Sequence, residues 1–205
     1  MGGGSIQSVS ADGTGQVKVL GKGDIAALSP DGKLLTYSVR DVKTKDDLWV
    51  TGLEEGAKPV PLLQTPAREW GPAISPDGHY VAYMSDESGR PEIYLTRFPS
   101  GGGKWQVSVD GGTTPVWARK SGELFFRNTD VLMVVPVTTQ PALTLGQPKE
   151  VFNAGAAKIL LGPGRRFDVD PDGKRILAVK SVGGAEVETG ITIVENWLGP
   201  FGKKP

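Results

Sequence analysis

The stretch Ser75-Pro76-Asp77-Gly78-His79-Tyr80-Val81-Ala82-Tyr83 decides the fold, because variants of it recur along the chain. The related stretches are SPDGKLLTYS at 29–38, RKSGELFFR at 119–127 and DPDGKRILAV at 170–179. The residues before the four glycines are 31, 77, 121 and 172, so the spacings are 46, 44 and 51 residues. Strand-like repeats of this length are typical of the blades of a β-propeller.

Each repeat combines a turn with a strand. Proline presets φ at the first corner, Asp or Ser can bond the nearby backbone, and glycine accepts a positive φ, so Pro76-Asp77-Gly78 predicts a tight turn. Residues 80–83 are aromatic, β-branched or small, which suits a strand buried on both faces. The pattern therefore predicts an all-β protein, a β-propeller of about four four-stranded antiparallel blades.

The composition of the chain argues against several classes of partner and site. The chain has 205 residues with 23 basic and 23 acidic side chains, so no overall field favours nucleic acid, and we expect no nucleic-acid partner. No apolar run reaches about 18 residues, so we expect no membrane insertion. The absence of cysteine excludes disulfides and thiolate metal sites within the sequence. Residues 1–5 resemble an added leader rather than a signal peptide.

The order of turns predicts how the chain is divided. Residues 6–20 read as a hairpin, residues 198–205 as a tail, and residues 154–164 as an irregular stretch. Blades are expected at about 21–65, 66–109, 110–152 and 153–197. The expected strands are 25–29, 34–39, 48–53, 60–64, 71–75, 80–85, 92–98, 104–109, 115–118, 124–128, 131–138, 149–152, 166–170, 175–181 and 191–196.

The last blade lacks an evident outer strand, whereas the hairpin at 6–20 has no inner strands ahead of it. A propeller closes its ring when a strand from one terminus completes the blade at the other, so we expect this hairpin to complete a blade. Four blades are few for a closed ring. The chain is therefore either a small ring or part of a larger one, and two copies could complete a ring as a homodimer.

The Pro-Asp pairs at 30–31, 76–77 and 171–172 resemble the PD40 repeats of TolB-type, WD40-like propellers, and the resemblance covers 6–197. More narrowly, 102–108, 111–113, 134–137 and 191–197 resemble the C-terminal propeller of long bacterial serine/threonine kinases. That similarity implies a sensor or docking propeller fused to a kinase, and the family resemblance favours a periplasmic or extracytoplasmic place. We expect no cofactor. No kinase motif is present in the sequence.

The best binding candidates precede the inner strands, because that segment of a propeller reaches the mouth of the channel. They are Asp24, Trp70, Thr114 and Arg165, with Arg68, Glu69 and Arg166 beside them. Arg and Trp are enriched in binding hot spots, and paired arginines can hold a carboxylate. We expect a protein, peptide or small ligand there. In the alternative interpretation Trp70 packs between blades and the arginines pair with local acids.

Three other patterns in the sequence have simpler structural interpretations. Residues 168–173 resemble the start of a calcium loop, but Val179 stands where a bidentate Glu is needed, which favours a blade turn. His79, the only histidine, is expected to be an exposed turn residue, and no Gly-x-Ser-x-Gly motif occurs. Gly101 to Lys104 reads as a hairpin tip rather than a phosphate loop.

Three functions follow. The first is a non-catalytic interaction module, without catalytic residues, metal or cofactor. The second is the propeller of a hydrolase or a carbohydrate-active enzyme, in which Asp24, Glu69 and Asp168 would be the carboxylates to consider. The third is a structural unit that assembles with a second copy.

Overall fold

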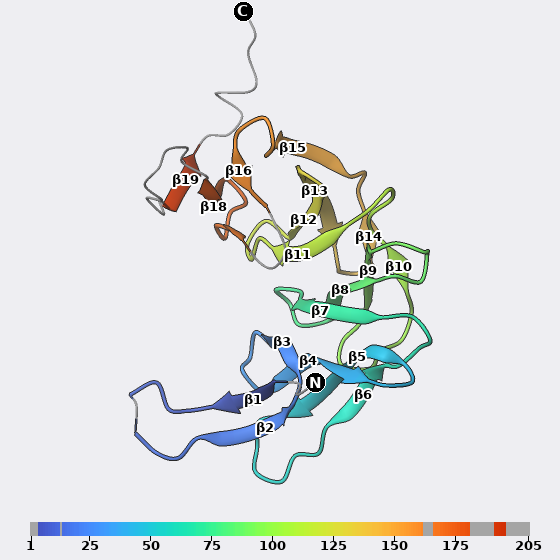
Figure 1. Ribbon diagram of the computed structural model, residues 1–205, viewed down its shortest axis with the longest axis vertical. Coiled ribbons are helices and arrows are strands. Elements are labelled where there is room, and N and C mark those ends of the chain that lie inside the picture. The colour runs from blue at the N-terminus through green and yellow to red at the C-terminus, as the bar shows by residue number, and fades with distance from the viewer. Residues whose placement is uncertain (1–3, 13, 162–165, 181–190, 196–205) are drawn as a thin grey trace, which may run out of the picture.

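The structure, a computed structural model, describes residues 4–12, 14–161, 166–180 and 191–195, and its described regular elements are all β-strands. No helix among these residues has the length and apolar character needed to cross a bilayer. Figure 1 shows the sheets following one another in chain order, with the blue hairpin of β1 and β2 at one end and β18 and β19 at the other. We call the four larger sheets blades 1 to 4.

Blades 1 to 3 have the same order of strands. Blade 1 contains β3 (Asp24–Leu28), β4 (Leu34–Asp41), β5 (Lys45–Gly52) and β6 (Val60–Leu63). Blade 2 contains β7 (Glu69–Ile74), β8 (Tyr80–Ser85), β9 (Glu92–Arg97) and β10 (Trp105–Gln106). Blade 3 contains β11 (Thr113–Trp117), β12 (Glu123–Asn128), β13 (Val131–Thr138) and β15 (Lys149–Asn153), and β14 (Thr144–Leu145) also pairs with β13.

Blade 4 is less regular. Its strands are β16 (Ile159–Leu160), β17 (Phe167–Val169), β18 (Arg175–Lys180) and β19 (Ile191–Glu195). Both β16 and β17 pair with β18, as does β19. In the stretch expected to be irregular, 154–164, residues 154–158 form a turn in which the Ile159 amide bonds to the Ala154 carbonyl at 2.8 Å, the short strand β16 follows, and residues 162–164 lie outside the described residues.

The Ser-Pro-Asp-Gly turns are built as predicted. In blade 2 the Ser75 hydroxyl donates to Asp77 Oδ1 at 2.5 Å and accepts from the Tyr80 amide at 3.0 Å. The Gly78 amide, at φ +75°, closes the turn on the Ser75 carbonyl at 2.9 Å. The side chain of Ser75 therefore connects the end of the inner strand to the start of the next.

Three apolar clusters hold the blades together, one at each junction. Between blades 1 and 2, Leu48 and Val50 pack with Val81 and Tyr83. The opposite face of β8 carries Ala82 and Met84 into the cluster between blades 2 and 3. A third cluster joins blades 3 and 4 around residues such as Phe125, Phe152, Phe167 and Ile176. The predicted two-sided burial of β8 is confirmed.

Strand β10 is shorter than the 104–109 expected from the sequence. Beyond Gln106, the side chain of Ser108 takes over a strand contact, because its hydroxyl oxygen accepts from the Ile93 amide at 2.7 Å. A side-chain acceptor thus replaces a backbone carbonyl. Alternating apolar residues cannot reveal such a replacement.

The hairpin at the start forms a sheet of its own. Strands β1 (Ser5–Ser8) and β2 (Lys18–Lys22) pair with each other, and the Gly23 amide bonds to the Gly4 carbonyl at 2.9 Å. Lys18 Nζ lies 3.2 Å from the Leu53 carbonyl of blade 1. In the described residues this hairpin therefore lies beside blade 1. That the hairpin completes a blade at the other end of the chain stays a prediction.

Candidate functional site at the inner-strand entry

The inner strands of blades 1, 2 and 3 each begin with a β-bulge. The register of pairing shifts between Asp24 and Ala26, between Trp70 and Ala73, and between Thr113 and Val116. At each shift one residue has a positive φ, namely Ile25 at 43°, Gly71 at 65° and Thr114 at 57°. Bulges redirect side chains and often flank functional sites, so this recurring feature sets where the candidate residues point.

Two of these bulges are tied to the preceding blade. The Gly71 amide donates to Ser38 Oγ of blade 1 at 3.2 Å. The Thr114 amide lies 3.3 Å from Met84 Sδ of blade 2. Ser38 and Met84 are equivalent, since they pair with Asp24 and Trp70 at the start of their own inner strands. The bulge therefore fixes the rim of one blade against its neighbour.

Arg68 is the centre of a group of side chains that includes two of the predicted site residues, Arg68 and Trp70. Its Nε and terminal nitrogen donate to Asp46 Oδ2 at 2.8 and 2.6 Å. Arg40 Nε reaches the other oxygen of the same carboxylate at 2.9 Å. Burial alone would raise the pKa of Asp46, but the hydrogen bonds and charges of the two arginines outweigh it and lower the pKa. Asp46 stays ionised and holds Arg68 in place.

Trp70 completes this group. The guanidinium carbon of Arg68 lies 4.6 Å from the centre of the indole, a distance at which a cation is attracted to the ring. The half-buried indole also packs against the cluster between blades 2 and 3. For Trp70 and Arg68 these contacts are the ones that the alternative interpretation expects, and a binding role for the two residues stays a prediction. Because the Arg68 side chain is still 39% exposed, the pair also faces solvent.

Glu69 differs from its two neighbours because its side chain is buried, with the residue 2% exposed. Thr65 Oγ1 donates to Oε1, whereas Oε2 has no hydrogen-bond partner in the described structure. Burial raises the pKa of Glu69, and the hydrogen bonds from Thr65 offset only part of the rise. The carboxyl group therefore lies inside the protein beside the β6–β7 loop and does not present a charge at the surface.

The remaining predicted residues are spread along the inner edge. Asp24 is exposed at the start of β3, Thr114 is half-buried in the bulge of β11, and Arg166 is exposed just before β17. Arg165 lies outside the described residues. Sequence analysis missed Asp46, although the acidic pair at 46–47 lies at the start of β5, directly after the β4–β5 turn, and this position was the available signal.

The other candidate sites have structural roles in the described residues. The Asp170 carboxylate accepts from the Lys174 and Arg175 amides at 2.7 and 3.0 Å, so residues 168–173 form the predicted blade turn. The described residues contain no group of three or more His, Asp or Glu side chains arranged to hold a metal ion. His79 is exposed, as expected, and Gly101 to Lys104 form the tip between β9 and β10.

Comparison with solved structures identifies the fold. TolB from Acinetobacter baumannii superimposes with a TM-score of 0.62 at 19% identity, over 94% of this chain and 46% of that one. The putative TolB from Agrobacterium tumefaciens gives 0.55 at 19% identity, over 72% and 60%. The chain has the fold of a TolB-like β-propeller. A puromycin-hydrolyzing peptidase from Mycobacterium tuberculosis gives 0.53 at 16% identity, over 91% and 29%.

At the level of sequence, no family model matches this TolB-like propeller. A stretch of 72 residues is 38% identical to dipeptidyl-peptidase 5 of Porphyromonas gingivalis, which is 33% of this chain and 10% of that protein. The chain thus spans a tenth of that relative and about half of the TolB structures. The resemblance to propellers of bacterial kinases stays a prediction.

Proposed function

We propose that this TolB-like propeller is a non-catalytic interaction module that binds a protein or peptide partner at the entry of its inner strands. The observation that carries the proposal is the Arg68–Trp70 pair, which two hydrogen bonds to Asp46 hold in a fixed geometry while part of Arg68 faces solvent. Arg and Trp are the residue types that dominate binding energy when they are held in this way. Fixed side chains also lose little entropy on binding.

The chemistry of the pair favours a partner with an acidic or aromatic side chain. Asp46 occupies one edge of the Arg68 fork, and the face of Trp70 is shared with the same guanidinium. A carboxylate can approach the donors that remain, and an aromatic ring can pack beside the indole. Asp24 and Thr114, at the equivalent bulges of the flanking blades, would contact the ends of such a peptide.

The test is selection of peptides from a displayed library on the purified chain, followed by affinity measurement with variants. Trp70→Ala and Arg68→Ala should each weaken a selected peptide by at least about tenfold, the loss expected for a hot-spot side chain. Arg119→Ala, an exposed arginine in the β11–β12 turn, is the matched control. Unchanged affinity in a folded Arg68→Ala, Trp70→Ala double variant would show that the peptide binds elsewhere.

A second candidate is the propeller of a hydrolase, which the short match to dipeptidyl-peptidase 5 favours. In that case the chain would guide substrate to a catalytic domain. Isolated chain should then bind short peptides without cleaving them. Turnover of an ester, peptide or glycoside substrate that is lost on changing Glu69 or Asp168 would instead indicate catalysis within this chain.

The third candidate is assembly with a second copy. It is favoured by apolar side chains left exposed in the first and fourth blades, among them Ile25 (55%), Leu28 (54%) and Leu177 (41%). Light scattering on a sizing column tests it directly, because a homodimer has twice the 21.7 kDa of the chain. A monomeric mass at all concentrations measured would count against assembly.

A further inference from the structure

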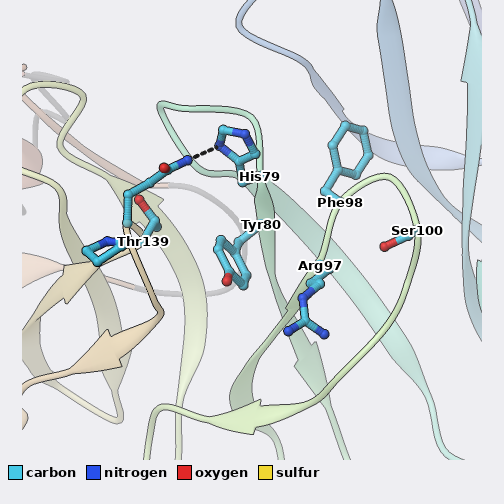
Figure 2. Close-up of a pocket in the computed structure, with 8 residues that line it drawn as sticks. His79, Tyr80, Arg97, Phe98, Ser100 and Thr139 are labelled. Carbon is cyan, nitrogen blue, oxygen red and sulfur yellow. Dashed lines mark hydrogen bonds between the residues drawn. The ribbon is translucent and has the colours of Figure 1, made fainter.

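A groove lies between blades 2 and 3, at the end of β7 and β8 opposite the rim described above. The register places Glu69 against Ser85 at one end of this strand pair and Ile74 against Val81 at the other, where the groove lies. It is open to solvent, has a volume of about 250 Å³ and is shown in Figure 2. Its lining residues are His79, Tyr80, Arg97, Phe98, Ser100, Thr139, Gln140 and Pro141.

Contacts between the two blades close one side of this groove. His79 Nδ1 lies 3.0 Å from Asp77 Oδ2 and 3.3 Å from Gln140 Nε2 of blade 3. Thr139, next to Gln140, also hydrogen-bonds to the Asp77 carboxylate. Figure 2 shows the His79 contact as a dashed line, with Tyr80 and Arg97 below it. The negative charge of Asp77 is therefore satisfied by donors at the His79 side.

The other side of the groove is cationic. Arg97 pairs across the strands with Tyr80, and its guanidinium carbon lies 5.3 Å from the centre of the Trp105 ring. Trp105 in turn meets Tyr80 edge to face at 5.8 Å. Among the described residues no carboxylate pairs with Arg97, in contrast to Arg68 and Arg90, and none of the lining residues is acidic. The guanidinium donors are thus positioned by a ring but left available.

We propose that this groove binds a small carboxylate ligand whose apolar or aromatic part lies against Tyr80. The carboxylate would accept two parallel hydrogen bonds from Arg97, the arrangement that a guanidinium fork favours. The Ser100 hydroxyl and the Gln140 amide offer further polar contacts at the rim of the groove. A volume of about 250 Å³ lies below the range usual for drug-sized ligands, so a molecule of the size of benzoate or an acylated amino acid fits best.

The same chemistry has two sources, a free organic acid or the C-terminal carboxylate of a peptide. Both present one carboxylate on an apolar group. They differ in the peptide chain, which continues outside the groove in the second case only. The probes are therefore benzoate, N-acetylphenylalanine and the tripeptide N-acetyl-Gly-Gly-Phe, each compared with its carboxamide. Stronger binding of the tripeptide than of N-acetylphenylalanine would indicate a peptide terminus, and equal binding a free acid.

The experiment is a titration of the isotopically labelled full chain, followed by amide chemical shifts. We expect shifts at Tyr80, Arg97 and Gln140, and an affinity for each acid at least about tenfold above that of its carboxamide, because the amide loses the charge-assisted pair. Arg97→Gln should weaken binding of the acid to the level of the carboxamide. Arg97→Lys keeps the charge but not the fork, so its affinity should fall between the two.

A control variant separates loss of this site from loss of any arginine. Arg119→Gln removes an exposed arginine in the β11–β12 turn and should leave carboxylate binding unchanged. The comparison of acid and carboxamide on unaltered protein needs no substitution, so it holds even if a variant folds poorly. Equal affinity for acid and carboxamide, shifts confined to other blades, or full binding by folded Arg97→Gln would each overturn the proposal.

Discussion

Blade 2 and blade 4 are built from similar residues but differ in how they are buried. All six residues of β8, Tyr80–Ser85, are buried, because blade 1 covers one face and blade 3 the other. In β18, Ile176 and Ala178 are buried against blade 3, while Leu177 and Val179 are 41% and 37% exposed. A strand in this fold gains stability from neighbouring blades rather than from its own apolar content.

The comparison predicts where substitutions are costly. Leu95→Ala, at a fully buried position of blade 2, should lower the free energy of unfolding by about 3–5 kcal/mol, since the packed neighbours cannot fill the space. Leu177→Ala in blade 4 is the matched control and should cost less than about 1 kcal/mol. Denaturant titration of both variants measures the difference. Equal losses would mean that the outer face of blade 4 is covered in solution.

The second prediction compares charged side chains in the two blades. The Glu92 carboxylate of blade 2 is buried and accepts from Ser108 Oγ, from the Gly111 amide at 2.8 Å and from Arg90 at 3.0 Å. Glu92→Gln leaves these donors poorly matched and should cost about 2 kcal/mol. Asp172→Asn in blade 4, where the carboxylate is 51% exposed, should change stability by less than about 0.5 kcal/mol. Thermal unfolding of both variants measures the two losses of stability, and a loss for Glu92→Gln no larger than that for Asp172→Asn would contradict this prediction.

These contrasts also show what the sequence could predict. The turns at 29–32 and 75–78 have a local cause in Ser, Pro, Asp and Gly, so the strands on either side of them were placed well. Ser108 and Asp46 were missed because their partners, Ile93 and Arg68, lie 15 and 22 residues away. Contacts between blades depend on geometry that no local pattern encodes, and the groove at Arg97 is made by three separate loops.

The third prediction concerns the turns, which have full side-chain support in blade 2 but not in blade 3, where Ala118 replaces the serine. Burial alone would raise the pKa of Asp77, but hydrogen bonds from Ser75, Thr139 and His79 lower it to about 2. Its stabilising effect is therefore present above pH 4 and lost as the pH falls towards 2. Ser75→Ala should cost about 1 kcal/mol at neutral pH and less below pH 3.

The matched control for this turn is Ser121→Ala in blade 3, whose hydroxyl only reaches the Glu123 amide at 3.4 Å. Unfolding by denaturant at several pH values between 2 and 7 measures both variants. A cost of Ser75→Ala that stays constant down to pH 2 would contradict a role for the ionised Asp77.

The smallest expected effect is a gain. Because burial raises the pKa of Glu69, its carboxyl favours the neutral form, and its contribution to stability declines as the pH rises from the unfolded value of 4.5 towards the folded one. Glu69→Gln keeps the shape without the charge, so it should flatten this decline and slightly stabilise the protein at neutral pH. Stability profiles of the two proteins from pH 4 to 8 check it, and a destabilised variant at pH 7 would refute it.

The bulge at the start of each inner strand has a consequence for synthesis of the chain. The amides of Gly71 and Thr114 need acceptors on Ser38 and Met84, which are made about 30 residues earlier. Each new blade therefore bonds to a blade that has already been synthesised, and its own strands are neighbours in the sequence. We expect folding to advance from the N-terminal side one blade at a time, so that nascent chains ending after β10 already protect the amides of blade 1.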